Sequence, residues 1–174
     1  MLHGGPFEQA KILVADGNSY SRALIRMMLT NIGARTIYEA PDGADAINAI
    51  QAINPDLMIM NWDIPLLSAP ELMRIVRSPD TFPKADLPIL MVTEIAWESR
   101  IDLAISLGVH EILASPMSCN MMKQRIWNML HNPRPMIRAG EHFVPMPRES
   151  PRWKSLLAVE ARSGDQAAES SYLM

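Results

Sequence analysis

Short apolar runs alternate with longer amphipathic segments along the first 131 residues. Unbroken apolar runs of strand length occupy residues 11–15, 56–60, 88–93 and 111–114, and a weaker run covers residues 35–39. Runs of this length, bounded by polar residues, Pro or Gly, are typical of strands buried on both faces of a parallel sheet. Between them apolar residues recur every three or four positions, which predicts helices beginning near residues 19, 43, 68, 97 and 118.

Helix start and stop signals support this division of the chain. Asn18 and Ser19 suit a helix N-cap, Gly33 and Gly108 suit helix ends, and Pro133 follows the last helical segment. Strands that alternate with helices through short connections are expected to be parallel, with right-handed crossovers. We therefore predict a flavodoxin-like, doubly wound α/β fold with a five-stranded sheet of order 2-1-3-4-5. Its site should lie at the carboxyl ends of the strands, where the loops after the first and third strands meet.

The chain divides into an N-terminal extension at residues 1–10, an α/β domain at residues 11–131 and a tail at residues 132–174. Prolines crowd the first half of the tail, which predicts an extended or disordered linker. Within it, residues 151–162 place Trp153, Leu156 and Leu157 on one face of a potential short helix. A solvated tail and a helix that docks on the domain both fit this pattern.

Composition limits the classes of function. The 174 residues are 48% hydrophobic and 20% charged with a net charge of −3, which indicates a globular chain without the field expected of a nucleic-acid or membrane-surface protein. A single cysteine, Cys119, excludes an internal disulfide and suits a reducing compartment. No secretory signal and no membrane-spanning apolar run are present. A cytoplasmic protein is expected.

Motifs at the strand ends carry a more specific signal. An apolar strand runs into Asp16, another ends in Asn61-Trp62-Asp63-Ile64-Pro65, a third ends in Thr93, and Ser115-Pro116 follows the last. Together with the segments at residues 39–46 and 104–109, these motifs occur in the order and spacing of one family. The chain resembles the receiver domain of bacterial two-component response regulators, specifically the chemotaxis-type single-domain receiver, over residues 11–130.

The resemblance implies a phosphorylation site whose chemistry depends on a few polar groups. In the family an acidic pair and an acceptor Asp hold Mg²⁺, the acceptor carboxylate attacks phosphorus, and a hydroxyl and a Lys stabilise the phosphoryl oxygens. Of these positions, Asp16 and Thr93 are kept. Gly17 stands in place of the second acid, and Asn61 stands in place of the acceptor Asp. Ser115 replaces the Lys, Ile112 replaces the aromatic residue that the family uses as a rotamer switch, and Glu94 adds a negative charge.

Concerted loss of nucleophile, metal ligand and Lys predicts a degenerate receiver that acts without phosphorylation. It would be a non-enzymatic signalling adaptor in a phosphorelay, without a cofactor. A weak Mg²⁺ site through Asp16 and Asp63 stays open, because two carboxylates and water can hold the ion. The alternative is a regulator that is phosphorylated, or responds to a metal, through an unusual acceptor such as Asp63.

If the site is silent, the function must come from contacts with other proteins. Trp97, Met121 and Trp127 fall off the core stripes of the last two helices, and Trp and Met are enriched at binding surfaces. We expect a partner such as a histidine kinase, another regulator or a second copy of the chain at this face. Docking of the tail there, or no contact at all, are the other interpretations. A small-ligand binder that uses Arg134, Arg138, Arg148 and Arg152 is a further alternative.

Overall fold

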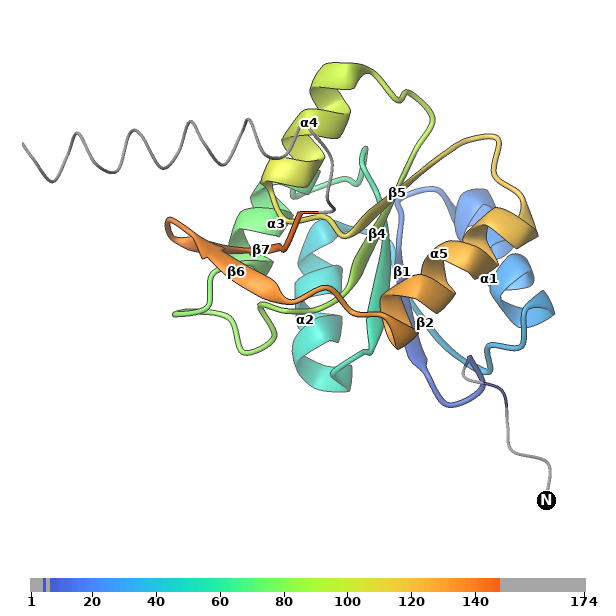
Figure 1. The fold of residues 1–174 in the computed structure, drawn as a ribbon. Helices are drawn as coiled ribbons and strands as arrows, with labels where there is room; N and C mark the ends of the chain where they lie inside the picture. The colour runs from blue at the N-terminus through green and yellow to red at the C-terminus, as the bar shows by residue number, and fades with distance from the viewer. Residues whose placement is uncertain (1–4, 6, 148–174) are drawn as a thin grey trace, which may run out of the picture.

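Five parallel strands form the central sheet of the computed structural model, which describes residue 5 and residues 7–147. Their order is β2-β1-β3-β4-β5, which confirms the predicted topology (Figure 1). The strands are β1 Lys11–Ala15, β2 Thr36–Ala40, β3 Leu57–Asn61, β4 Ile89–Thr93 and β5 Glu111–Ala114. The three central strands, β1, β3 and β4, are buried almost throughout, which is why they appear in the sequence as unbroken apolar runs.

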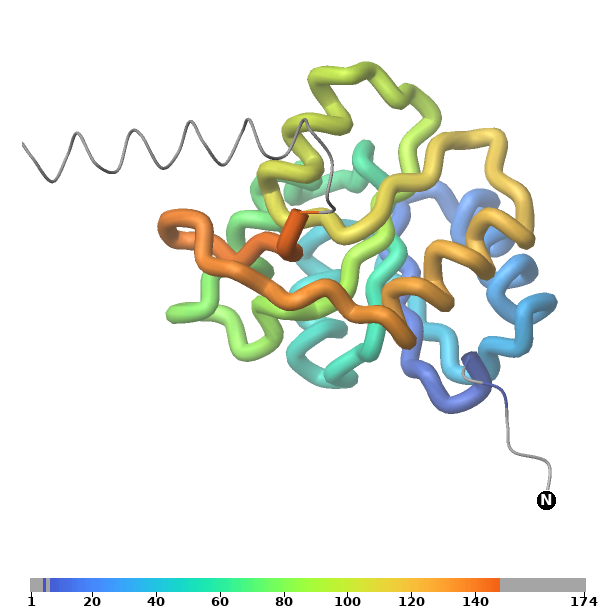
Figure 2. Tube along the Cα trace, in the orientation of Figure 1, coloured from blue at the N-terminus to red at the C-terminus, as the bar shows by residue number. Residues whose placement is uncertain are grey.

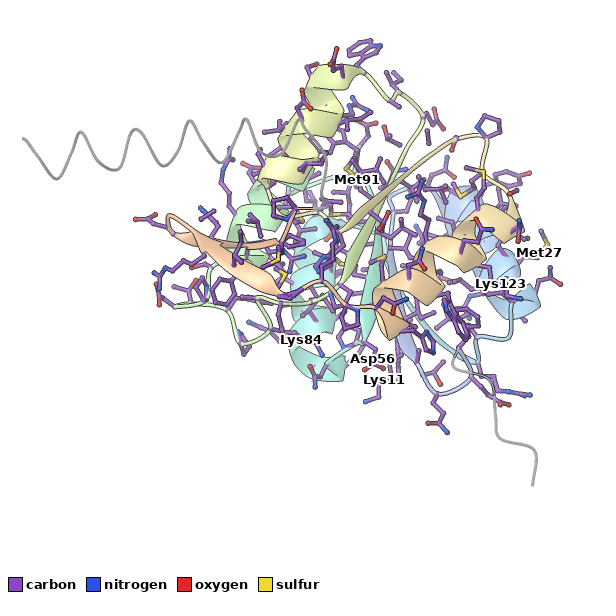
Figure 3. All side chains as sticks on the ribbon, in the orientation of Figure 1. Lys11, Met27, Asp56, Lys84, Met91 and Lys123 are labelled. Carbon is purple, nitrogen blue, oxygen red and sulfur yellow. The ribbon has the colours of Figure 1, made fainter. Side chains whose placement is uncertain are left out.

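Five helices cover the two faces of this sheet. They are α1 Ser19–Asn31, α2 Gly43–Ile53, α3 Ala69–Val76, α4 Glu98–Ser106 and α5 Cys119–His131. One apolar cluster packs α2, α3 and α4 against one face, and a second packs α1 and α5 against the other (Figure 2). The side chains in Figure 3 illustrate this layering: Met91 of β4 is buried in the first cluster, and Met27 lies on the exposed side of α1. None of the helices in this described region is long and apolar enough to cross a bilayer.

Side-chain caps fix where most helices begin. Asn18 and Asp42 accept hydrogen bonds from the first-turn backbone of α1 and α2, and Ser118 does so for α5. Ser68 and Glu71 form a reciprocal capping box at the start of α3. Each of these caps follows a strand, so it sets the position of the loop at the carboxyl edge of the sheet.

The segment after α5 differs from the expectation of an extended linker. Strands β6 Met136–Ala139 and β7 His142–Pro145 form an antiparallel hairpin whose turn contains Gly140 at φ +62°. The hairpin packs on the domain, since the Phe143 N–H donates to the carbonyl of Arg77 at 2.9 Å. The predicted tail-docking residues Trp153, Leu156 and Leu157 lie outside the described residues, as does the helix expected at residues 151–162.

A buried arginine explains how the hairpin is held. The guanidinium of Arg77, at the end of α3, donates to the carbonyls of Gly108, Ala85 and Leu87 at 2.7 to 3.0 Å. Burial lowers the pKa of Arg77 to about 9, so the group stays charged at neutral pH. Backbone carbonyls thus replace the water that the cation loses, and the C-terminal ends of α3 and α4 are joined beneath the hairpin.

His110 completes this buried polar centre. Its Nδ1 lies 3.2 Å from the Arg77 guanidinium and 3.3 Å from the Ile89 N–H, so Nδ1 must be the unprotonated acceptor. Its carbonyl accepts a hydrogen bond from Arg134, which ties the segment entering β6 to the start of β5. Burial, reinforced by the charges of Arg77 and Arg134, lowers the pKa of His110 to about 2.

Stability should therefore fall as the medium is acidified. His110 stays neutral in the folded chain while an unfolded His binds a proton below about pH 6.5, so protons favour unfolding between the two pKa values. Relative to pH 7.5, we expect a loss of about 2 kcal/mol in unfolding free energy at pH 5. Urea titrations across this range measure it.

Two variants test whether His110, rather than another histidine, causes this dependence of stability on pH. His110→Asn keeps an acceptor near the Ile89 N–H and should flatten the pH dependence, whereas His131→Gln, at the exposed end of α5, should leave it unchanged. An unchanged pH dependence in His110→Asn would contradict this assignment.

Candidate functional site

The candidate site lies at the carboxyl edge of the sheet, as predicted. Asp16 directly follows β1, Asn61 ends β3 and Thr93 ends β4. Because β3 lies between β1 and β4, these three side chains meet at one place. An open pocket there is lined by residues from the loops after β1, β3 and β4: Asp16, Gly17, Asn18, Ser19, Ser21, Asn61, Asp63, Pro65 and Glu94.

The Asp16 carboxylate is buried and fully engaged. Its Oδ1 accepts from the Asn18 N–H at 2.8 Å, and its Oδ2 accepts from Ser21 Oγ at 2.6 Å and from Asn61 Nδ2 at 3.0 Å. Three donors thus satisfy this buried carboxylate. Asp16 is thereby used as the acceptor that organises the start of α1.

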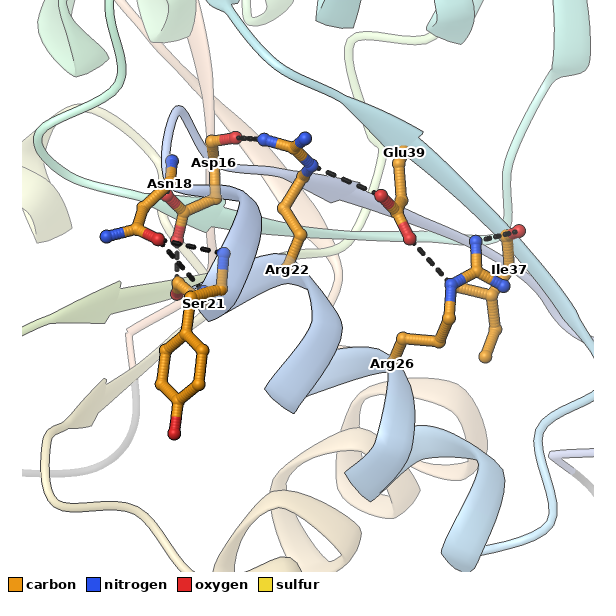
Figure 4. A network of polar contacts seen from close by, with 8 residues as sticks. Asp16, Asn18, Ser21, Arg22, Arg26, Ile37 and Glu39 are labelled. Atoms are coloured by element: carbon orange, nitrogen blue, oxygen red, sulfur yellow. Dashed lines mark hydrogen bonds and ion pairs between the residues drawn. The ribbon is translucent and has the colours of Figure 1, made fainter.

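A second polar network lies just behind Asp16. Arg22 donates to the Asp16 carbonyl at 2.7 Å and to Glu39 at 3.1 Å, and Arg26 contacts the same Glu39 carboxylate at 2.6 Å (Figure 4). The hydrogen bond from Arg26 is the main reason why the pKa of Glu39 lies below its ordinary value. These contacts join α1 to β2 and hold the Asp16 turn in place.

Asn61 uses both ends of its amide. Nδ2 donates to Asp16, and Oδ1 accepts from the Asp63 N–H at 2.9 Å. A carboxylate in the same position would bring a second negative charge to about 3.0 Å from Asp16 Oδ2, where the amide places a donor. The amide of Asn61 is therefore a neutral group that joins the end of β3 to Asp16 by a hydrogen bond.

Gly17 leaves no room for the second acid. A Cβ at this position would lie 2.6 Å from Pro65 Cδ and 2.9 Å from Pro65 Cγ. The loop after β3 has therefore closed onto the backbone of the loop after β1. The sequence shows the loss of the acid at residue 17, whereas only the structure shows that its space is filled.

Thr93 is engaged by a residue that the sequence analysis missed. Arg100 Nη1 donates to Thr93 Oγ1 at 3.0 Å and lies 3.3 Å from Asp63 Oδ2. Its guanidinium also lies 5.4 Å from the ring of Trp62 and 6.0 Å from that of Trp97, within cation–π range. The helix dipole disfavours a cation in the first turn of a helix. The position of Arg100 near the start of α4 was therefore a signal in the sequence that this residue has partners elsewhere.

The remaining predicted site residues surround this centre. Ser115 follows β5, forms a cis peptide bond with Pro116, and its N–H donates to the Thr93 carbonyl at 2.9 Å. Ile112 is half-buried and packs against the α2–α3–α4 cluster. Glu94 is exposed and lines the pocket with Asp16 and Asp63, so the local charge is negative.

Magnesium is poorly accommodated by this donor set. Asp16 already accepts three hydrogen bonds, Gly17 offers no side-chain ligand, and the Asp63 carboxylate lies against the Arg100 guanidinium. In the described part of the chain, no three His, Cys, Asp or Glu side chains gather around a common point. A hard cation that prefers several oxygen ligands would have to break these contacts to bind.

The predicted partner residues do not form one patch. Trp97 is 65% exposed at the start of α4, hence at the carboxyl edge, and Met121 is 42% exposed in the first turn of α5. Trp127 lies further along α5, which runs back toward the other edge, and is 41% exposed. Phe7 packs edge-on against Trp127 at 5.8 Å, and His131 stacks on it at 3.8 Å.

The tail arginines within the described region are engaged internally. Arg134 donates to the carbonyls of His110 and Met146, and burial lowers its pKa. Arg138 donates to the carbonyl of Gly140 and pairs with Asp80. These contacts hold the hairpin, so the ligand-binding role considered for the two residues competes with a structural one.

Comparison with known proteins identifies the class. The family model for the response regulator receiver domain matches residues 12–127. The chemotaxis protein CheY of Pseudomonas aeruginosa is 31% identical over 116 residues, which cover 67% of this chain and 92% of that protein. The chain belongs to the receiver domain family of two-component signalling proteins.

Solved structures show the same fold at lower identity. The receiver domain of a sensor histidine kinase from Pseudomonas aeruginosa, with magnesium in its active-site cleft, is 20% identical with a TM-score of 0.62, covering 70% of this chain and 97% of that one. The chemotaxis protein CheY4 of Vibrio cholerae is 22% identical with a TM-score of 0.61, covering 68% and 97%. The match to the family model ends at residue 127, before the hairpin.

Filling the space beside Gly17 should destabilise the fold. Gly17→Ala places a methyl group against Pro65, and overpacking of this kind costs about 1–3 kcal/mol of unfolding free energy. Gly5→Ala is the matched control, because nothing lies within 4 Å of a Cβ at that position. Equal denaturation midpoints for the two variants would contradict the closed loop.

Restoring the acceptor carboxylate should create a dependence on Mg²⁺. Asn61→Asp removes the donor to Asp16 and sets two carboxylates side by side, so we expect a loss of about 1–3 kcal/mol without metal. Millimolar Mg²⁺ should raise the melting temperature of this variant and leave the wild type unchanged. Asn48→Asp, which adds the same charge at an exposed position of α2 away from the pocket, controls for nonspecific cation effects. Equal stabilisation of the wild type by Mg²⁺ would show a resident site.

Proposed function

We propose that this receiver domain acts as a phosphorylation-independent, non-enzymatic adaptor that signals by protein contact. The observation that carries the proposal is the Asn61 Nδ2 to Asp16 Oδ2 hydrogen bond at 3.0 Å. This bond places an amide at the position that corresponds to the acceptor Asp, and it engages the carboxylate of Asp16. Transfer of a phosphoryl group needs a nucleophilic carboxylate and positioned positive charge, and the pocket offers an amide and added negative charge.

The other changes support the same conclusion. The closed loop at Gly17 and Pro65 removes space for a metal ligand, and Ser115 contributes no cation. Arg100 brings a positive charge to Thr93, but this charge is paired with Asp63. The arrangement therefore favours one fixed state of the loops after β3 and β4, with any Mg²⁺ bound weakly.

The alternative acceptor, Asp63, gains little support from this geometry. Its carboxylate is paired with Arg100 and its backbone N–H is bound by Asn61. Attack on phosphorus by Asp63 would require the ion pair to break, and the retained Asp16 has no oxygen left without a donor. We infer that signalling through a phosphorylated Asp63 is disfavoured.

For the partner, we propose a histidine kinase, another regulator or a second copy of the chain. The exposed side of α5 suits such a contact, because Trp127 presents apolar surface among the polar side chains of Asn120, Lys123, Gln124 and Asn128. An apolar anchor within a polar surround is the usual composition of a protein interface.

The test is whether partner binding is unchanged by a substitution at Asn61 and by a phosphodonor. Tagged full-length wild type, Asn61→Ala and Trp127→Ala chains are used to capture proteins from cells that express the chain, with and without a small-molecule phosphodonor. We expect equal recovery by wild type and Asn61→Ala in both conditions, and about tenfold lower recovery by Trp127→Ala. Met27→Ala, which removes an exposed Met from α1, is the control. Recovery that changes with the phosphodonor would contradict the proposal.

A further inference from the structure

Exposed apolar side chains follow pocket-lining residues on two loops. Leu66 follows Pro65 in the loop after β3, and Ile95 and Trp97 follow Glu94 in the loop after β4. Their exposed fractions are 78%, 41% and 65%. We call these three residues the edge patch. Large apolar residues gathered beside a polar pocket mark a contact surface more often than side chains scattered singly do.

The backbone of Leu66 adopts a conformation that a leucine residue disfavours. Leu66 adopts φ +68°, in the left-handed region that a Leu rarely occupies. Such strain persists only where surrounding structure imposes it, and it is concentrated at functional loops. Within the described residues the side chain remains largely exposed, so the strained conformation is not compensated by burial of that side chain.

Arg100 orders Trp97 before any contact is made. The guanidinium lies beside Trp97 and Trp62 and is itself fixed by Thr93 and Asp63. An exposed Trp that is already held in place loses little conformational entropy on binding. This makes Trp97 the natural anchor of the edge patch.

Charge and chain length indicate what covers this surface. Asp63 and Glu94 make its rim acidic, and Glu94 has no ion pair with the described residues. Residues 148–162 combine Trp153, Leu156 and Leu157 with four basic residues, Arg148, Arg152, Lys154 and Arg162, against two acidic ones. Apolar side chains flanked by cations are complementary to an apolar patch with an acidic rim.

The segment starts within reach of the edge patch. It follows β7, whose Phe143 carbonyl lies against Gly108 at the end of α4, whereas Trp97 precedes the first residue of α4. The nine residues of α4 rise about 13 Å. Residues 148–153 can span at most about 20 Å when extended. The extended length of residues 148–153 therefore exceeds the rise of α4.

We propose that residues 148–162 dock in cis on the edge patch, with Trp153 against Trp97 and Lys154 beside Glu94 or Asp63. The contact leaves the α5 surface for a partner. This docking does not depend on whether a carboxylate of the pocket accepts a phosphoryl group, so the docking proposal and the proposed function can fail separately.

Zero-length carbodiimide cross-linking of the full chain tests the proposal, because it joins Lys154 only to a carboxylate in direct contact. We expect an amide between Lys154 and Glu94 or Asp63, located by peptide mapping. The three other lysines, Lys11, Lys84 and Lys123, lie away from the start of α4 and serve as internal references (Figure 3). Cross-links of Lys154 confined to Asp80 and Glu141, at the turn end of the hairpin, would overturn the proposal.

Two variants and a mixing experiment complete the design. Trp153→Ala and Trp97→Ala should each lower the Lys154 cross-link about tenfold or more, as truncation of a central Trp does at an interface. Leu173→Ala, outside the segment, should leave it unchanged. Equal yields from all three variants would contradict docking. In a mixture of ¹⁵N-labelled and unlabelled chains, cross-links within one chain support the proposal, and cross-links between chains would assign the edge patch to a second copy.

Discussion

The hydrogen bond between Asn61 and Asp16 is the constraint on which the chemistry of this receiver domain depends. It joins the ends of β1 and β3, the place where the fold brings together residues from two loops. A carboxylate at residue 61 would repel Asp16 and require a cation between them, whereas the amide donates to Asp16 and needs none. Once that bond is made, Asp16 serves the cap region of α1, and Pro65 can close over Gly17. The fold of the family is kept, and under the proposed function neither metal nor phosphate is required.

A second constraint lies at the opposite edge of the sheet, around Arg77. This buried cation is satisfied by three backbone carbonyls and His110, and the hairpin of β6 and β7 is hydrogen-bonded to the Arg77 carbonyl. The polar centre thus fixes the ends of α3 and α4 and the start of the tail together. At the carboxyl edge, Arg100 plays a comparable part by joining α4 to Thr93 and Asp63. The two arginines hold α4 at both ends, which suits a domain that presents one fixed surface.

Much of the fold could be predicted from the sequence because its strands are buried on both faces and its helices carry explicit caps. The site positions followed from the same reasoning, since Asp16, Asn61 and Thr93 end parallel strands that are neighbours. Arg100 was missed because its partners are 7 and 37 residues away in sequence, and no local pattern connects them. The hairpin was missed because prolines in residues 132–147 favour a linker, whereas its stability comes from long-range contacts with Arg77 and His110. The separation of Trp97 from Trp127 likewise depends on the direction in which α5 runs.

The intact mass of the wild-type chain after incubation with Mg²⁺ and a small-molecule phosphodonor tests the central claim most directly, with a phosphorylation-competent receiver domain treated in parallel. The account predicts an unchanged mass for this chain while the competent domain gains one phosphoryl group. A mass increase of one phosphoryl group, mapped to Asp63 or any other carboxylate of the pocket, would contradict the account and show that the site still accepts phosphate.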